Sequence, residues 1–191
     1  MKKEWKNIIS DFKFYLTLEK SLSENSVDAY IRDISKLANY TDKLPVEIDL
    51  KELESFVYEL NKSLLSAVSQ ARIISGIKAF FLYLIQEDII HENPTELLEA
   101  PKIGKKIPEV LSVEEIDFLL SKIDLSKPEG HRNKAIVETL YSCGLRVSEL
   151  TNLKLSNLHF DEGFILVRGK GSKQRIVPIG EKAVHEIHIY R

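Results

Sequence analysis

The sequence has too few cysteines for an internal disulfide or a zinc cluster, since Cys143 is the only one in 191 residues. It also has no long apolar run: the longest, from Ala79 to Ile85, is seven residues, whereas a membrane-spanning helix needs about 20. The first residues have no apolar stretch followed by a small-residue cleavage site, as a secretory signal has. These absences predict a protein of the cytoplasm, without disulfides and without a membrane partner.

Excess positive charge is missing as well. The chain has 27 Lys and Arg against 29 Asp and Glu, a net charge of −2, which argues against a protein that binds any polyanion through a general positive field. Residues 1–101 have 12 basic and 17 acidic side chains, and residues 102–191 have 15 and 12. Much of the positive charge lies in two runs, Lys102–Lys106 and Arg168–Arg175. Phosphate recognition must therefore be local, made by individual side chains.

Helical periodicity dominates the first hundred residues. Four helices are predicted, at Lys6–Leu18, from an N-cap at Ser23 to Ala38, at Leu50–Leu60 and at Leu65–Gln86. Asn93-Pro94 ends this block, and the proline- and lysine-rich segment after it is typical of an extended linker. We therefore expect a helical domain at residues 1–100, a linker at 101–110 and a second domain at 111–191.

The second domain mixes helices with short β-strands. Ser112 and Glu115 form the capping-box pattern of a helix start. A second helix is predicted from Arg132 to Ser142, and Gly144 after it can adopt the left-handed conformation that ends a helix. The runs Phe164–Arg168 and Arg175–Ile179 surround a Gly-Lys-Gly-Ser turn, which predicts a hairpin, and a last helix begins at Glu181. The predicted fold is mainly α with a small β-hairpin or sheet, and the second domain has a thin core.

The fourth predicted helix has small residues on the side opposite its apolar face. Arg72, Ser75, Gly76 and Ala79 share that side at 100° per residue. Small residues beside one arginine would let a DNA sugar–phosphate chain approach closely. A helix–helix contact through small residues explains the same pattern, and the pattern alone favours that alternative.

Two segments carry the pattern of a phosphate site. Arg146 follows a helix-ending Gly-Leu, and Glu149 can hold its guanidinium so that the fork of donors faces two oxygens of one phosphate. The run Arg168–Arg175 places four cations in eight residues, with Lys170 between two glycines. The alternatives are a surface ion pair of little energetic value and an ordinary turn. The Gly-Lys-Gly segment does not fit a P-loop, because a glycine replaces the Ser or Thr after the lysine.

The chain resembles the tyrosine recombinases of the phage-integrase family, and most of all their bacterial Xer-type members, which resolve chromosome dimers. The matching stretches are Ser23–Leu37, Arg72–Leu84, Asn93-Pro94, Leu111–Ile116, Gly144–Leu150 and Gly169–Gly180. The resemblance implies an N-terminal four-helix core-binding (SAM-like) domain and the first half of an α/β catalytic domain, which together close on DNA as a clamp.

The resemblance also implies roles for individual residues. Arg146 corresponds to the first catalytic arginine and Lys170 to the catalytic lysine of the hairpin, with Glu149 orienting Arg146. Neither a metal nor another cofactor is implied. Double-stranded DNA and a second recombinase protomer, in a tetramer on paired sites, are the implied partners, in the bacterial cytoplasm at the nucleoid. The predicted DNA-binding residues are Arg72, Ser75, Lys102, Lys105, Lys106, Arg168, Lys173 and Arg175.

The family's remaining catalytic residues, including the tyrosine nucleophile, have no counterpart in these 191 residues. His188 to Arg191 spells the family's H-x-x-R, and Tyr190 lies within it, but these residues come too soon after the hairpin, and a solvated helix end is the favoured interpretation. We therefore expect a partial recombinase that binds DNA weakly or not at all alone and does not cleave it. The alternatives are a noncatalytic DNA-binding clamp and a helical module that docks another protein.

Overall fold

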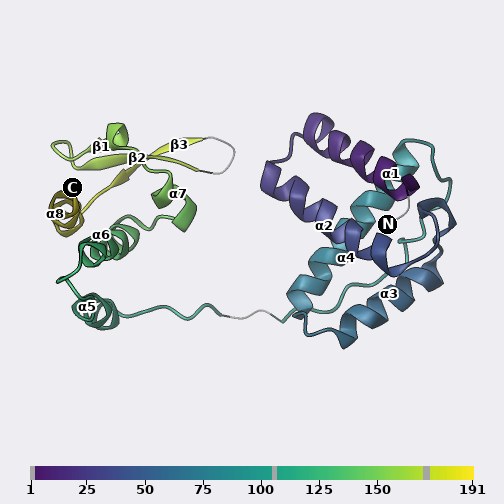
Figure 1. Ribbon diagram of the computed structural model, residues 1–191, viewed down its shortest axis with the longest axis horizontal. Helices are drawn as coiled ribbons and strands as arrows, with labels where there is room; N and C mark the ends of the chain where they lie inside the picture. Colours follow the sequence, from purple (N-terminus) through teal and green to yellow (C-terminus); the bar gives the residue numbers. More distant parts are fainter. Residues whose placement is uncertain (1–2, 105–106, 170–172) are drawn as a thin grey trace. The chain divides into compact units, whose positions relative to one another are not determined.

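The chain divides into two units, Met1–Lys106 and Ile107–Arg191, and the computed structural model describes residues 3–104, 107–169 and 173–191 of them. The four helices predicted for the first unit are confirmed (Figure 1). The first helix begins earlier than predicted and ends in the π-helical turn η1 (Tyr15–Glu19). The described elements of this unit are α1 (Lys3–Phe14), η1, α2 (Glu24–Tyr40), the 3-10 turn η2 (Pro45–Glu47), α3 (Leu50–Lys62) and α4 (Ala67–Gln86).

An aromatic cluster fills the core of the first unit. The ring of Trp5 stacks on Phe80 with centroids 5.8 Å apart, and Phe12 meets Phe80 edge-on at 5.3 Å. The Trp5 indole N–H donates to the Lys43 carbonyl at 3.0 Å, so the one polar atom of this ring is satisfied. Among the described residues, α4 is the one helix long and apolar enough to span a membrane by length and composition. Its apolar side chains lie in this core, which is the pattern of a core helix.

The small-residue side of α4 packs against α2. Gly76 is buried, and a Cβ there would lie 3.1 Å from both Cβ and Oδ2 of Asp33. The Arg72 guanidinium makes a two-point pair with the Asp33 carboxylate, at 2.5 and 2.9 Å. The helix–helix alternative is therefore confirmed at Gly76, where Asp33 fills the space that a close approach of DNA would need, whereas Arg72 and Ser75 remain exposed.

We expect removal of Arg72 to destabilise the first unit more than removal of Asp33. The Asp33 side chain is 2% exposed and that of Arg72 is 49% exposed. Arg72→Ala therefore leaves a buried carboxylate unpaired, at the low end of about 3–5 kcal/mol, whereas Asp33→Ala leaves a guanidinium that water can solvate. Urea unfolding at pH 7 measures both free energies of unfolding. Equal losses, or a larger loss for Asp33→Ala, would contradict this account of the pair.

The second unit is built on a three-stranded antiparallel sheet in the order β1-β2-β3. The predicted hairpin is confirmed, with Ile165 opposite Val177. The sequence did not predict β1, which has only two residues. The described elements are α5 (Val113–Ser121), α6 (Pro128–Cys143), α7 (Val147–Thr151), the 3-10 turn η3 (Leu155–Asn157), β1 (Leu158–His159), β2 (Phe164–Arg168), β3 (Gln174–Pro178) and α8 (Glu181–Tyr190).

The core of this unit is small, as predicted. An ion pair of 2.8 Å between Lys134 and Glu186 joins α6 to α8, and the Gly180 N–H donates to the Ser142 hydroxyl at 3.0 Å. The ion pair joins the middle of the two helices, and the Gly180–Ser142 hydrogen bond holds the end of α6 close to the start of α8. The buried apolar residues are Cys143, Leu145, Ile165, Val167, Val177, Ile179 and Ala183.

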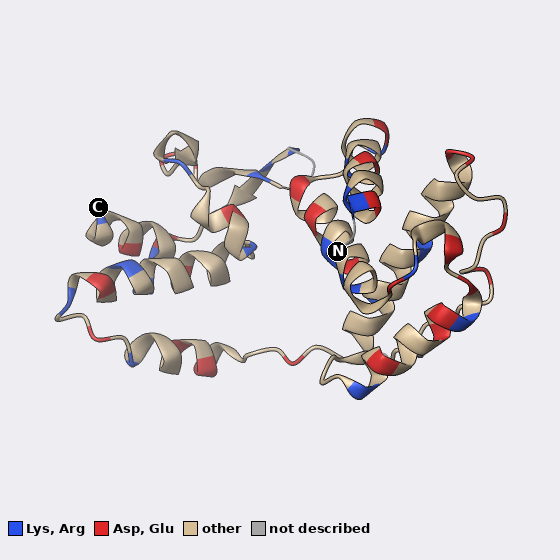
Figure 2. Cartoon of the chain, turned by 45° about the vertical axis from the view of Figure 1, so that its right-hand side comes forward, with Lys and Arg blue, Asp and Glu red and all other residues tan. Residues whose placement is uncertain are grey.

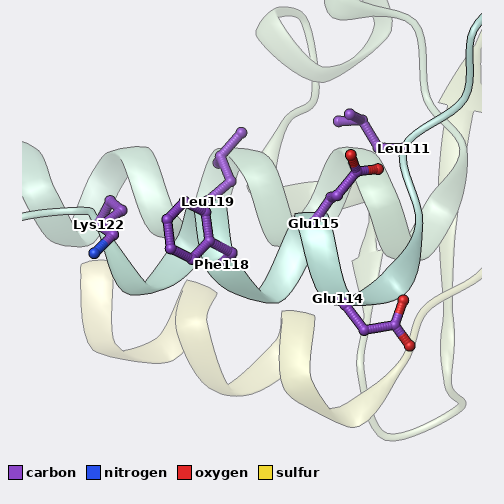
Figure 3. A pocket seen from close by; sticks show the side chains of 6 residues that line it. All are labelled: Leu111, Glu114, Glu115, Phe118, Leu119 and Lys122. Atoms are coloured by element: carbon purple, nitrogen blue, oxygen red, sulfur yellow. The ribbon is translucent and has the colours of Figure 1, made fainter.

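Helix α5 contributes no buried residue to this core. The predicted capping box is confirmed: the Ser112 backbone N–H donates to the Glu115 carboxylate at 2.8 Å, and the Glu115 N–H donates to the Ser112 hydroxyl at 3.2 Å. Apolar side chains including Phe118 and Leu119 are exposed on the helix. Figure 3 shows the side chains that line a pocket there, which are Leu111, Glu114, Glu115, Phe118, Leu119 and Lys122.

Candidate phosphate site

The turn between α6 and α7 sets the position of Arg146. Gly144 ends α6 in the left-handed region, at φ +56° and ψ +37°, as the sequence predicts. Leu145 is buried in the core, and Arg146 is extended at the N-cap of α7, at φ −74° and ψ +151°. A helix stop and an apolar anchor therefore precede the arginine, so that its backbone is fixed although its side chain is 72% exposed.

Glu149 holds this arginine from the first turn of α7. Its Oε2 accepts a hydrogen bond from the Arg146 backbone N–H at 2.9 Å, and its Oε1 accepts one from the Nη1 of Arg146 at 3.0 Å. The Glu149 side chain is only 3% exposed. The predicted contact is therefore confirmed, and the alternative of a weak surface ion pair does not describe it, because the carboxylate is buried.

A second arginine reaches the same carboxylate from β3. The Nη1 and Nη2 of Arg175 lie 2.7 and 2.9 Å from the Oε1 and Oε2 of Glu149. The run of cations in the sequence groups Arg175 with the predicted DNA-binding residues and does not reveal this contact. The alternation of β3 contained a signal for it, since Arg175 lies two residues before Val177 and on the same strand face, and Val177 is buried.

The electrostatics of this cluster favour an ionised carboxylate. The hydrogen bonds from Arg175, then from the backbone N–H of Arg146 and from its guanidinium, lower the pKa of Glu149 to about 2, although burial opposes the shift. Glu149 is therefore charged at neutral pH. Two guanidiniums share one carboxylate, so the cluster keeps one net positive charge, which suits a phosphate oxygen.

The other predicted site residues have different surroundings. Arg168 and Lys173 are exposed at the ends of the hairpin strands, where Figure 2 shows a concentration of basic residues. Lys102 and Ser75 are exposed in the first unit, and the Ser75 hydroxyl donates to the Ala71 carbonyl at 2.9 Å.

Three of the predicted residues, Lys105, Lys106 and Lys170, lie outside the described residues. His188 and Tyr190 are exposed on α8, as expected for a solvated helix end. Within the described ranges, no group of three or more His, Cys, Asp or Glu could hold a metal ion. The site that the structure assembles is therefore Arg146, Glu149 and Arg175, all in the second unit.

Comparisons with known proteins match both units to one family. Residues 109–190 match the phage integrase family, and residues 9–88 match the phage integrase N-terminal SAM-like domain. The tyrosine recombinase XerD of Staphylococcus aureus strain N315 is 38% identical over 187 residues, which is 96% of this chain and 63% of the relative. The XerD of Staphylococcus haemolyticus is 37% identical with the same coverage. The chain thus spans about 63% of the length of the curated relatives it matches.

Solved structures show the same fold at lower identity. A lambda integrase tetramer bound to a Holliday junction matches with a TM-score of 0.76 and 18% identity, over 96% of this chain and 55% of that chain. The Tn1549 transposon integrase in complex with transposon right end DNA matches with a TM-score of 0.71 and 20% identity, over 95% and 64%. The helical unit followed by the start of an α/β unit is therefore the architecture of integrases.

Proposed function

Because the chain belongs to the phage integrase family, we propose that it takes part in site-specific DNA recombination. The observation that carries this proposal is the state of Arg146. Its guanidinium is tied to a buried carboxylate by one hydrogen bond of 3.0 Å, yet its side chain is 72% exposed. A guanidinium that is fixed and still open to solvent can bind a phosphodiester without first being ordered.

The proposed chemistry is transfer of a DNA phosphoryl group to a tyrosine. The tyrosine hydroxyl gives its proton to a base and its oxygen attacks phosphorus, the bond to the 5′ oxygen breaks, and that oxygen takes a proton. Arg146 stabilises the negative charge that builds on the nonbridging oxygens, and Lys170 supplies the proton as general acid. The resemblance places the tyrosine outside these 191 residues. Neither a metal nor another cofactor has a step in this scheme.

The proposed partners are duplex DNA and further recombinase protomers. The lambda integrase structure is that of a tetramer bound to a Holliday junction, and the Tn1549 integrase is bound to transposon end DNA. In this chain, Arg168 and Lys173 would meet phosphates beside Arg146. Contacts from the first unit and the linker would come from Arg72, Ser75, Lys102, Lys105 and Lys106. Such a protein would act in the bacterial cytoplasm at the nucleoid, in chromosome partition at cell division.

A noncatalytic DNA-binding role is the second candidate. The observation that favours it is that Arg168 and Lys173 are exposed at the ends of the hairpin strands, where they can bind phosphates without any reacting group. This role needs the cations of the hairpin and of the first unit but no general acid. The two candidates differ in what Arg146→Ala does to cleavage once a nucleophile is present.

DNA binding by this chain is expected to be weak and steeply dependent on salt. Each phosphate that a cation neutralises contributes a slope of about −0.9 to the plot of log affinity against log salt. Arg146, Arg168 and Lys173 alone therefore predict a slope of about −3, and each contact made by the linker or the first unit makes the slope steeper. Fluorescence anisotropy with a labelled duplex at 20–200 mM salt, about a tenfold range, measures it. An affinity independent of salt would contradict the proposal and would favour a protein-docking module.

The same preparation is expected to form no covalent product with DNA. A suicide substrate, nicked beside the cleavage point, traps a phosphotyrosine because the broken end diffuses away. Denaturing gel electrophoresis of the mixture detects the adduct by its lower mobility. A tyrosine-linked adduct on this chain would show that a residue within it is the nucleophile, with Tyr190 as the first candidate.

A further inference from the structure

We propose that Arg175 is a positioning residue that ties the β2–β3 hairpin to the Arg146 turn, rather than a residue that contacts DNA. This inference rests on the proposed function, because the position of the hairpin matters only if Lys170, the residue that follows Gly169 in the sequence, takes part in the reaction. It replaces the DNA-binding role that the sequence pattern suggests for Arg175. The two guanidiniums that contact Glu149, those of Arg146 and Arg175, differ in how many of their donors the carboxylate engages.

The two arginines share Glu149 unequally. Arg175 uses both terminal nitrogens on both carboxylate oxygens, at 2.7 and 2.9 Å, which is the strong two-point geometry. Arg146 shares only Oε1 through its side chain, at 3.0 Å. The exposed fractions agree, at 40% for the Arg175 side chain and 72% for that of Arg146. Both terminal nitrogens of Arg175 are therefore engaged by the carboxylate, whereas Arg146 is anchored through Nη1 alone and keeps its other donors open for a phosphate.

The base of the hairpin is shaped around this pair. A Cβ on Gly169 would lie 3.2 Å from the Nη1 of Arg175 and 3.4 Å from the Oε1 of Glu149. The absence of a side chain at Gly169 thus leaves room for the guanidinium to reach the carboxylate. The Gly169 N–H also donates to the Lys173 carbonyl at 2.8 Å, which closes the strand pair at the same level.

The pair therefore links two segments that the sequence keeps 26 residues apart. Arg175 lies on β3 opposite Val167 of β2, and Glu149 lies on α7, directly after the turn that places Arg146. Gly169 comes immediately before Lys170. A contact that fixes the hairpin at Gly169 therefore fixes, relative to Arg146, the residue that precedes Lys170 in the sequence.

The test separates charge from geometry with Arg175→Lys, Arg175→Ala and the matched control Lys173→Ala. Lysine keeps the positive charge but cannot form the two-point pair. We expect both Arg175 variants to raise the pKa of Glu149 from about 2 toward its ordinary value of 4.5, measured by NMR of the side-chain carboxyl carbon. Both variants should also increase the mobility of the Gly169 amide. Lys173→Ala should leave both observables unchanged.

Salt dependence supplies the second readout. We expect the slope of log DNA affinity against log salt to stay at the wild-type value in both Arg175 variants and to become less negative by about one in Lys173→Ala. A slope that is less negative by about one in Arg175→Ala and returns to the wild-type value in Arg175→Lys would make Arg175 a phosphate contact and overturn the proposal. An unchanged Glu149 pKa in Arg175→Lys would overturn it too. Absence of DNA binding by a longer chain that also carries the tyrosine would contradict the proposed function instead, and the Glu149 titration, which needs no DNA, would still decide whether Arg175 holds the hairpin.

Discussion

Replacing Arg146 with alanine is expected to lower DNA cleavage by about 10²–10³-fold, the usual loss when one donor to a developing oxyanion is removed. The reaction can be measured on a chimera that joins this chain to the part of the Staphylococcus aureus XerD beyond the matched region, which the family resemblance expects to carry the tyrosine. The rate of covalent adduct formation on a suicide substrate is the readout. The wild-type chimera sets the reference.

Two observations distinguish this effect from loss of folding or of binding. Arg146→Lys keeps the charge but not the fork of donors, so we expect it to restore only a small part of the rate. Affinity for duplex DNA should fall no more than severalfold in Arg146→Ala, because Arg168 and Lys173 still meet phosphates. If Arg146→Ala still cleaves DNA at the wild-type rate, the proposed catalytic role of Arg146 is refuted and the noncatalytic DNA-binding role is favoured.

Replacing Glu149 with alanine is expected to produce the second large loss, on the order of 10²-fold in the same cleavage assay, because a reacting group displaced by about 1 Å costs that much. Without the carboxylate, Arg146 loses its side-chain anchor, and Arg175 loses the group that both of its terminal nitrogens contact. Glu149→Gln is the matched control, since it keeps the size and one acceptor oxygen. Its rate should lie between those of the wild type and the alanine variant.

The pH dependence of this cluster has a definite sign. The pKa of Glu149 is lowered from 4.5 to about 2, so the ionised carboxylate favours the folded unit. Its contribution to stability is fully present above about pH 4.5 and is lost as the pH falls through about 2. The difference in stability between the wild type and Glu149→Gln should therefore stay constant from pH 8 to 5 and shrink below that. A difference that grows as the pH falls would contradict the pairing.

Local sequence signals predicted local structure well. Ser112 with Glu115, and Gly144 at the end of α6, have requirements that a few neighbouring residues satisfy, so each could be located from the sequence. The contact between Arg146 and Glu149 spans three residues and is of the same kind. The cation-rich hairpin was found because its turn composition and its alternation agree.

Contacts between distant segments could not be predicted in the same way. Arg72 and Asp33 lie 39 residues apart, and their pair depends on how α4 crosses α2. A pattern of small residues predicts a close approach but not what approaches. Arg175 finds Glu149 through the register of β3, which a sequence of exposed cations does not reveal. Strand β1 has two residues, too few to show the alternation of apolar and polar side chains by which a strand is predicted.

The most direct test of the central claim, that Arg146 is a held guanidinium offered to a DNA phosphate, is the DNA titration followed residue by residue by ¹⁵N NMR at low salt. We predict that the largest changes fall on the Arg146 guanidinium and on the amides of Arg168 and Lys173, and that they vanish together as salt is raised. The Arg175 guanidinium should change much less. Large changes confined to residues far from Glu149, or an Arg146 signal that stays fixed while DNA binds, would contradict the account.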